Sequence, residues 1–224
     1  MNNTATKAAT RTDEDIKPLR ICGLLGVLSL ASYLAAMVLS PAAYPGYDWM
    51  SSAVSDLSAV GAPSRELWMR LSCLYDPCGI VCATAACVYV AYRRPADKTL
   101  RAGIYLFTAM EWLSTVGYRL FPLDDPGKTL AGFTEFMHVY VVTTAVVLLS
   151  IASLVCIIVS GARGKGPKSL ARWAGLALAM MFCGAAGSGI VPPQYFGIAE
   201  RVSLVAAVGF NAVLGLYLWR GLLR

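Results

Sequence analysis

The sequence predicts an all-α protein, a polytopic membrane bundle of six transmembrane helices with a short amphipathic helix in the first external loop. Composition is the first observation, because 57% of the residues are hydrophobic and 14% are charged, whereas soluble domains carry about 25% charged residues. The apolar residues also fall into blocks of about 20, the length with which a helix crosses a hydrocarbon core about 30 Å thick. Apolar and polar residues do not alternate as they do in a membrane β-barrel. Such blocks must satisfy their backbone amides internally, so we expect helices.

The predicted spans cover residues 20–40, 69–92, 101–121, 132–160, 171–191 and 197–219. They form a single domain, residues 20–220, between a disordered tail of residues 1–19 and a short tail of residues 221–224. The first block could be taken for a secretory signal, since basic residues precede it and small residues follow. It lacks a clear small-x-small cleavage site before Pro41 and is followed by the other blocks. We therefore interpret it as a retained first helix.

Lysine and arginine are concentrated on one side of the predicted spans. They occur in both tails, between the second and third spans and between the fourth and fifth: Lys7, Arg11, Lys17, Arg20, Arg93, Arg94, Lys98, Arg101, Arg163, Lys165, Lys168, Arg172, Arg220 and Arg224. The remainder of the 19 basic residues are Arg65, Arg70, Arg119, Lys128 and Arg201. The positive-inside rule then places both termini in the cytoplasm, and the loops at 41–68, 122–131 and 192–196 outside the cell membrane.

The net charge and the cysteine content limit which partners and cofactors the sequence predicts. The net charge of +6 is interpreted as a topology signal and a weak attraction to anionic lipid. We expect membrane lipids as partners and no nucleic acid, because no groove of aromatic and basic residues is evident. All seven cysteines fall within predicted spans and the chain has one histidine, which cannot supply a zinc motif or two axial haem ligands. We therefore expect no metal and no cofactor, and the sequence does not determine the oligomeric state.

The first external loop carries a helical pattern over residues 48–63. Its apolar side chains recur at intervals of four, four and three residues, namely Trp49, Ala53, Leu57 and Val60, which predicts a short amphipathic helix. Asp48 can cap its start, and Pro63 follows its end. This helix could simply cover the bundle at the interface. Alternatively, it could be a lid that presents Ser55 and Asp56 to the pocket that contains His138.

The one histidine, His138, lies near the start of the fourth span, one helical turn after Glu135. Ionisable side chains that face hydrocarbon are costly, so we expect this pair to point into the protein or into a wet cavity. Arg119 and Asp124 lie within one loop of the pair. Asp124 can also act as a helix cap, because it places negative charge near the amino end of the fourth span. These residues predict a polar cluster in the outer third of the membrane.

Four motifs carry a resemblance to a known family. They are YPGYDWMSSAVSDLSAVGAP, then GYRLFPLDDPG, then a histidine early in the following span, and then GIAERVSL. Together they resemble a family of prokaryotic multi-pass membrane proteins, domain of unknown function 998, over about residues 20–220. The resemblance implies a multi-pass helical protein whose motif positions are Ser55, Asp56, Leu57, Phe121, Pro122, Asp124, His138, Glu200 and Arg201. It implies no particular activity.

Two acidic residues lie inside the predicted spans. Glu111 is midway along the third span, where it forms a polar stripe with Thr115 and Tyr118 at helical spacing. Asp76 precedes Pro77 in the second span, where the proline can allow a kink. Intramembrane acids can relay protons or bind a cation, or they can be hydrogen-bonded packing residues.

Small residues mark the packing faces of the last two spans. The sixth span carries Ser203, Ala207, Asn211 and Gly215 at four-residue intervals, and the fifth carries GAAGSG at residues 184–189. Because small side chains let membrane helices approach closely, we expect these two faces to pack on each other.

Three classes of function remain open. The first is a protein that binds or transports a small polar or amphipathic ligand in an outer pocket, above Asp76 and Glu111, lined by Ser55, Asp56, Arg119, Asp124, Glu135, His138, Glu200 and Arg201. The second is a structural or assembly subunit in which the same residues only fix the loops. The third is a membrane-embedded hydrolase or transferase with His138 as general base, Ser55 or a water as nucleophile and Asp124 as the acid that orients the base.

Overall fold

The structure is a computed structural model that describes residue 14 and residues 16–123 and 132–223. The described residues are helical with no strand, which confirms the all-α prediction. The α-helices are α2 (Leu24–Leu39), α3 (Arg65–Leu71), α4 (Tyr75–Arg93), α5 (Lys98–Leu120), α6 (Phe133–Phe136), α7 (Thr143–Ala162), α8 (Lys168–Ile190) and α9 (Phe196–Trp219). Short 3-10 helices occur at Ser40–Ala43, Ser55–Leu57 and Pro193–Tyr195, and a π-helical segment spans Met137–Val142.

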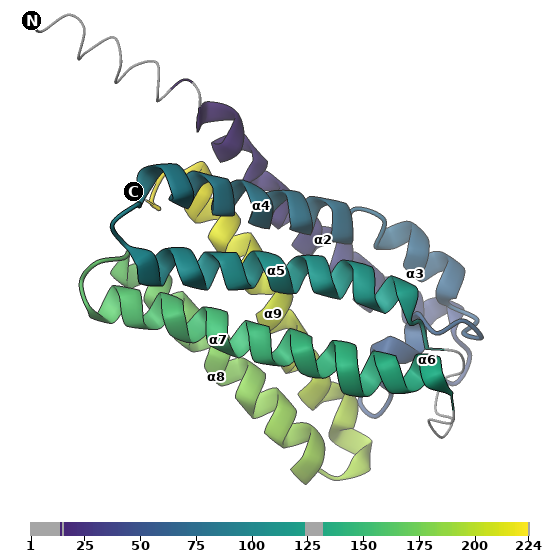
Figure 1. Cartoon of the computed structure of the whole chain (residues 1–224). Coiled ribbons are helices and arrows are strands. Elements are labelled where there is room, and N and C mark those ends of the chain that lie inside the picture. The colour runs from purple at the N-terminus through teal and green to yellow at the C-terminus, as the bar shows by residue number, and fades with distance from the viewer. Residues whose placement is uncertain (1–13, 15, 124–131, 224) are drawn as a thin grey trace, which may run out of the picture.

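The long helices form a ring in chain order (Figure 1). Helix α4 packs between α2 and α5, α7 packs between α5 and α8, and α9 closes the ring by packing on both α8 and α2. Helix α9 also contacts α4 across the ring. Both chain ends lie at one end of the bundle, since the Arg20 side chain donates hydrogen bonds to the Trp219 carbonyl oxygen at 2.9 and 3.1 Å.

Five helical segments of the described chain are long and apolar enough to cross a membrane: Ile16–Ala43, Arg65–Arg93, Phe133–Ala162, Lys168–Ile190 and Pro193–Trp219. The chain is therefore a multi-pass membrane protein. Helix α5 is equally long but less apolar, because it carries Glu111, Arg101 and Arg119. It runs beside α4 and α7, each part of a candidate span (Figure 1). That α5 itself crosses the membrane, and hence that the bundle has six membrane-spanning helices, stays a prediction.

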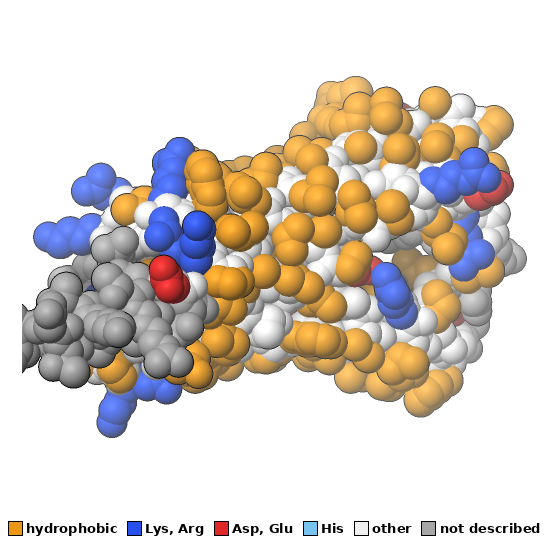
Figure 2. Space-filling view, turned by 90° about the horizontal axis from the view of Figure 1, so that it is seen from above, with side chains coloured by type: hydrophobic (Ala, Val, Ile, Leu, Met, Phe, Trp, Pro, Cys, Tyr) orange, Lys and Arg blue, Asp and Glu red, His pale blue; other side chains and the backbone are white. Residues whose placement is uncertain are grey.

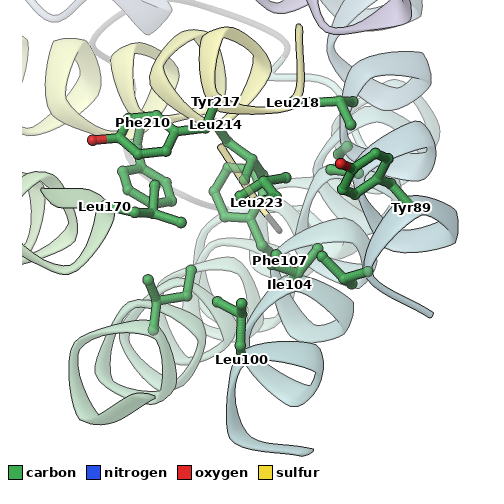
Figure 3. Close-up of a cluster of buried hydrophobic side chains, with 14 of the residues drawn as sticks. Tyr89, Leu100, Ile104, Phe107, Leu170, Phe210, Leu214, Tyr217, Leu218 and Leu223 are labelled. Atoms are coloured by element: carbon green, nitrogen blue, oxygen red, sulfur yellow. The ribbon is translucent and has the colours of Figure 1, made fainter. Parts of the chain in front are cut away.

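Large apolar side chains cover the outside of the bundle, as expected for helices in lipid. Figure 2 shows a broad hydrophobic band across the middle of the face it presents, with most of the visible basic side chains at one end. Exposed examples include Leu148, Phe182 and Ile190. The interior is tightly packed at the end that holds the termini, where Tyr89, Phe107 and Leu218 belong to one buried cluster (Figure 3).

The two chain ends differ from their predicted boundaries. The first helical run begins at Ile16, not at residue 20, and Ile16 is buried in the main core cluster. At the other end, Leu223 is fully buried in the same cluster (Figure 3). Residues predicted to belong to the tails thus contribute apolar area to the core.

The small residues of α9 pack against three different helices, α8, α2 and α4. Near the outer end, Gly184 of α8 lies against Ser203, so the predicted contact between these faces forms. Farther along α9, Gly215 lies against the backbone of Gly23, close to the start of α2. Asn211 lies against Gly26 of α2 and Gly79 of α4. The stripe therefore packs on α8 for only part of its length.

The loop of residues 44–64, predicted to be the first external loop, does not form the predicted amphipathic helix. Only a 3-10 turn, Ser55–Leu57, is helical between residues 48 and 63, and a separate helix, α3, follows it. The reason is that side chains take up the backbone N–H groups that a helix would use. Glu200 accepts from the N–H of Val54, and Asp56 accepts from the N–H of Ala53. Side-chain acceptors of this kind compete with helix formation.

Candidate functional site

The start of α9 binds the loop of residues 44–64 through a group that we call the loop cluster: Tyr47, Trp49, Asp56, Glu200 and Arg201. The Val54 N–H donates a 2.6 Å hydrogen bond to Glu200 Oε2. The guanidinium of Arg201 donates to the carbonyl oxygens of Ser52 at 3.2 Å and Gly197 at 2.8 Å, and to the Tyr47 hydroxyl. It also lies 4.4 Å from the ring centroid of Trp49, within cation–π range.

The loop cluster is closely packed and largely self-satisfied. Arg201 is 4% exposed, and the loop backbone approaches α9 so closely that a Cβ atom at Gly197 would lie 2.9 Å from the Met50 carbonyl oxygen. Burial raises the pKa of Asp56, an effect that the Ala53 N–H opposes. Nearby Asp48 faces solvent, and hydrogen bonds from Ser51 and Met50 lower its pKa. Each acid therefore stabilises a turn of the loop.

A second polar group, which we call the polar track, runs inward between α4 and α5. It begins with an ion pair in which Arg119 Nη2 lies 3.0 Å from Asp76 Oδ2. The Arg119 side chain is 68% exposed and that of Asp76 is 25% exposed. The Thr115 hydroxyl donates to the other carboxylate oxygen of Asp76 at 3.4 Å. Asp76 lies in the first turn of α4, and Pro77 follows it there, where a missing N–H is tolerated.

The inner end of the polar track lies where α2, α4, α5 and α9 meet. Glu111, one turn before Thr115 on α5, forms a hydrogen bond with Asn211 of α9. Gly79 of α4 makes room for this contact, since a Cβ atom there would lie 3.1 Å from Glu111 Oε2 and 3.2 Å from Asn211 Nδ2. The Ser29 hydroxyl of α2 closes the group and donates to the Tyr75 carbonyl oxygen at 2.7 Å.

Asn211 is left with an unsatisfied acceptor. Its Nδ2 donates to the Gly79 carbonyl oxygen at 3.2 Å, whereas its Oδ1 is buried and has no hydrogen-bond partner within the described part of the chain. The residue is 1% exposed. A buried polar atom without a partner costs about 1–3 kcal/mol, so this oxygen is the kind of group that a ligand would satisfy.

His138 lies in the π-helical segment Met137–Val142. Its Nδ1 is 2.6 Å from the Phe121 carbonyl oxygen, and because a carbonyl only accepts, Nδ1 carries the proton. The imidazole lies 4.6 Å, centroid to centroid, from the Tyr118 ring. The His138 carbonyl accepts from the Thr143 hydroxyl at 2.8 Å, which satisfies a backbone oxygen where the helix widens. Single π-helical turns occur frequently at functional sites.

The remaining predicted site residues lie apart from these groups or outside the described residues. Glu135 is buried and accepts from the Gly132 N–H at 3.0 Å, so it caps α6. Ser55 belongs to the 3-10 turn of the loop. Among the described residues, no hydrogen bond joins Ser55 to His138, as a nucleophile and base would require. Asp124 lies outside the described residues.

Contacts within the described residues join several of the predicted site residues into two groups. Asp56, Glu200 and Arg201 meet in the loop cluster, whereas Asp76, Glu111 and Arg119 meet in the polar track. Tyr47 and Asn211 complete these groups without having been predicted as site residues. Asn211 could have been found as the one amide in a stripe of small residues inside a span, where polar side chains are rare.

The comparison with known families identifies the chain. A family model described as "Protein of unknown function (DUF998)" matches residues 27–217. The chain belongs to the DUF998 family. No curated protein and no solved structure matches it. The matched residues of this DUF998 chain include the loop cluster, the polar track and His138.

Two further features of the DUF998 chain bear on ligands. Among the residues that the structure describes, no group of three or more His, Cys, Asp and Glu side chains could hold a metal ion. An apolar groove of about 310 Å³ is lined by Leu19, Cys22, Ile80, Val81, Thr84, Ala85, Val88 and Trp112. It lies on the lipid-facing side of α4, and its walls are suited to hydrocarbon and not to a polar ligand.

Proposed function

We propose that this DUF998 chain binds a small polar or amphipathic ligand in the outer half of its bundle, at the polar track. The unsatisfied Oδ1 of Asn211 carries the proposal. It lies at the buried end of a line of polar side chains whose other end, Arg119, is exposed. Intramembrane ionisable residues that face the bundle interior mark ligand or ion pathways more often than simple packing.

The loop cluster supports this function indirectly. Its hydrogen bonds join residues 47–56 to α9 at the end of the bundle where the polar track begins. A second hydrogen bond, from the Val60 N–H to the Leu123 carbonyl oxygen at 2.9 Å, joins the same loop to the end of α5. We therefore assign Asp56, Glu200 and Arg201 a structural role in fixing this loop, and we place ligand contact at Asp76, Glu111 and Asn211.

The binding proposal is tested by Asp76→Asn. Purified full-length protein in detergent is incubated with a panel of amino acids, amines, sugars, fatty acids and lipids, and its thermal unfolding is measured. A ligand at 100 times its Kd stabilises the folded state by about 2.7 kcal/mol. We expect at least one compound to raise the midpoint for the native protein and to lose most of this effect with Asp76→Asn.

The matched control is Glu66→Gln. Glu66 also pairs with an arginine, Arg70, but both side chains are more than 70% exposed on α3, so this variant should respond to the compound as the native protein does. If a compound stabilises the native protein, Asp76→Asn and Glu66→Gln equally, it binds outside the polar track. If no compound of the panel stabilises the native protein, the polar track is better explained as part of the architecture.

We also propose that the end of the bundle with both termini faces the cytoplasm of the cell. The Arg94 side chain donates to the carbonyl oxygens of Lys165 at 2.7 Å and Leu223 at 3.1 Å. Two basic connections and the carboxyl end therefore share one end of the bundle, and the positive-inside rule favours that end for the cytoplasm.

Reporter fusions to the carboxyl terminus test this orientation. We expect a green fluorescent protein fusion to fluoresce and an alkaline phosphatase fusion to be inactive, because the phosphatase requires export. A phosphatase inserted after Gly46 in the first loop should be active. The opposite pattern of activities would mean that the bundle is inverted.

A further inference from the structure

The unsatisfied buried group of the polar track is a hydrogen-bond acceptor, the Oδ1 of Asn211. The carboxyl groups of Asp76 and Glu111 and the Oδ1 of Asn211 are acceptors, whereas the donors are Thr115 and the exposed guanidinium of Arg119. The amide nitrogen of Asn211 is already bonded to Gly79 and Glu111. A ligand that completes this site must therefore bring donors.

Resting on the proposed function, we infer that the polar track binds its ligand through an ammonium group that replaces the Arg119 guanidinium at Asp76 and donates to the inner acceptors. An ammonium has three N–H donors and no acceptor. It therefore matches a site with two carboxyl groups and one unsatisfied amide oxygen. An anionic ligand would bring further acceptors to a site whose unsatisfied group is itself an acceptor.

The exposure of Arg119 makes the exchange feasible. Its side chain is 68% exposed, and within the described part of the chain only Asp76 forms hydrogen bonds with the guanidinium. Ion pairs with an exposed partner contribute only about 0–1 kcal/mol, so displacing Arg119 costs little. The displaced guanidinium can remain in the headgroup region or in water, because it lies near the end of α5.

An ammonium group can come from a free amine or from the headgroup of an aminophospholipid such as phosphatidylethanolamine. Both sources present the same donors to Asp76, and both can reach the exposed side of the ion pair. An experiment that supplies a free amine with or without the aminophospholipid distinguishes these two sources.

The chemistry is tested with butylammonium, using butanol as the uncharged analogue of the same chain length. Dissociation constants are measured calorimetrically for the purified full-length protein in a detergent without amines. We expect butylammonium to bind and butanol to bind at least tenfold more weakly, because loss of one charge-assisted hydrogen-bonded pair costs about 1.5–3 kcal/mol. Asp76→Asn should weaken butylammonium binding by a similar factor.

Arg119→Gln gives the sharpest result, because the inference predicts a gain. This variant removes the cation that competes for Asp76, so butylammonium should bind several-fold more tightly to it than to the native protein. Arg70→Gln removes a different arginine that forms an ion pair, at an exposed site on α3, and should leave the affinity unchanged. Should Asp76→Asn fail to fold, the change in butylammonium affinity of Arg119→Gln tests the inference by itself, because tighter binding supports it and weaker binding overturns it.

The lipid source is tested in nanodiscs of phosphatidylethanolamine or phosphatidylglycerol. If the headgroup occupies the site, butylammonium should bind more weakly in phosphatidylethanolamine, and Asp76→Asn should remove this difference. Equal affinity in the two lipids, with binding still dependent on Asp76, would identify a free amine as the ligand.

The outcomes separate this inference from the proposed function. Weaker butylammonium binding to Arg119→Gln, or equal binding of butanol and butylammonium, would overturn the ammonium inference. In that case an uncharged compound from the broader panel whose effect depends on Asp76 would still support ligand binding at the polar track. If no compound shows dependence on Asp76, both proposals fail together.

Discussion

Arg201→Ala is expected to lower the free energy of unfolding by about 2–4 kcal/mol and to release the loop of residues 44–64 from α9. The guanidinium is buried and holds the loop through Ser52, Gly197 and Tyr47. Its removal deletes the hydrogen bonds that a charged donor makes to these oxygens, and a hydrogen bond to a charged group contributes about 1.5–3 kcal/mol, while the Tyr47 hydroxyl keeps its bonds to the Ala53 and Ser52 carbonyl oxygens. It also removes the cation–π contact with Trp49.

Chemical denaturation in mixed micelles measures the first effect, and limited proteolysis within residues 44–64 measures the second. The control is Arg70→Ala, whose exposed ion pair on α3 is worth less than about 1 kcal/mol. We expect this control to retain both the native stability and the protease resistance of the loop. A protease-resistant loop in Arg201→Ala would show that the loop is held by its apolar contacts instead.

Gly215→Ala is expected to have the second large effect, because α2 and α9 cross at backbone contact there. A Cβ atom at Gly215 would overlap the carbonyl oxygen of Gly23 and lie 2.9 Å from the Sγ atom of Cys82. Neither helix can relieve this overlap by changing a side-chain rotamer, since the first contact is with backbone. Overpacking of this kind costs about 1–3 kcal/mol, and we expect the upper end of the range.

The matched control is Gly209→Ala on the same helix. A Cβ atom at Gly209 has nothing within 4 Å, so alanine there should be neutral or stabilising by about 0.5–1 kcal/mol, the usual gain in a helix interior. Unfolding midpoints of both variants in the same detergent provide the comparison. Equal midpoints would mean that α2 and α9 can separate at Gly215 without loss of stability.

The sequence was a good guide to the helices and a poor one to the connections. The apolar blocks predicted the candidate spans, because transfer of about 20 apolar residues into hydrocarbon depends on composition alone. The pattern over residues 48–63 predicted a helix that is not formed. Periodicity records which side chains prefer burial, but it does not show that Asp48, Asp56 and Glu200 will bind the backbone N–H groups of the loop.

The sequence predicted an outer pocket with Asp76 and Glu111 beneath it, and the contacts in the structure join residues of this candidate site into two groups. Sequence reasoning identified Asp76, Glu111 and Arg119 because ionisable residues in apolar segments are conspicuous. It could not show that Arg119 of α5 reaches Asp76 of α4, since this contact depends on how the two helices are rotated about their axes. Nor could it show that Asn211 faces Glu111, because their contact crosses 100 residues of chain.

The sequence by itself determined that this protein is an all-α membrane bundle of the DUF998 family, because composition and short motifs are local properties that need no partner to be read. Only the tertiary structure decided which polar residues meet. Helices of similar hydrophobicity can pack in many orders, and the order is set by close contacts such as that between Gly23 and Gly215. Those contacts fix the rotation of each helix, and the rotation leaves Arg201 with the loop and Asn211 with the polar track.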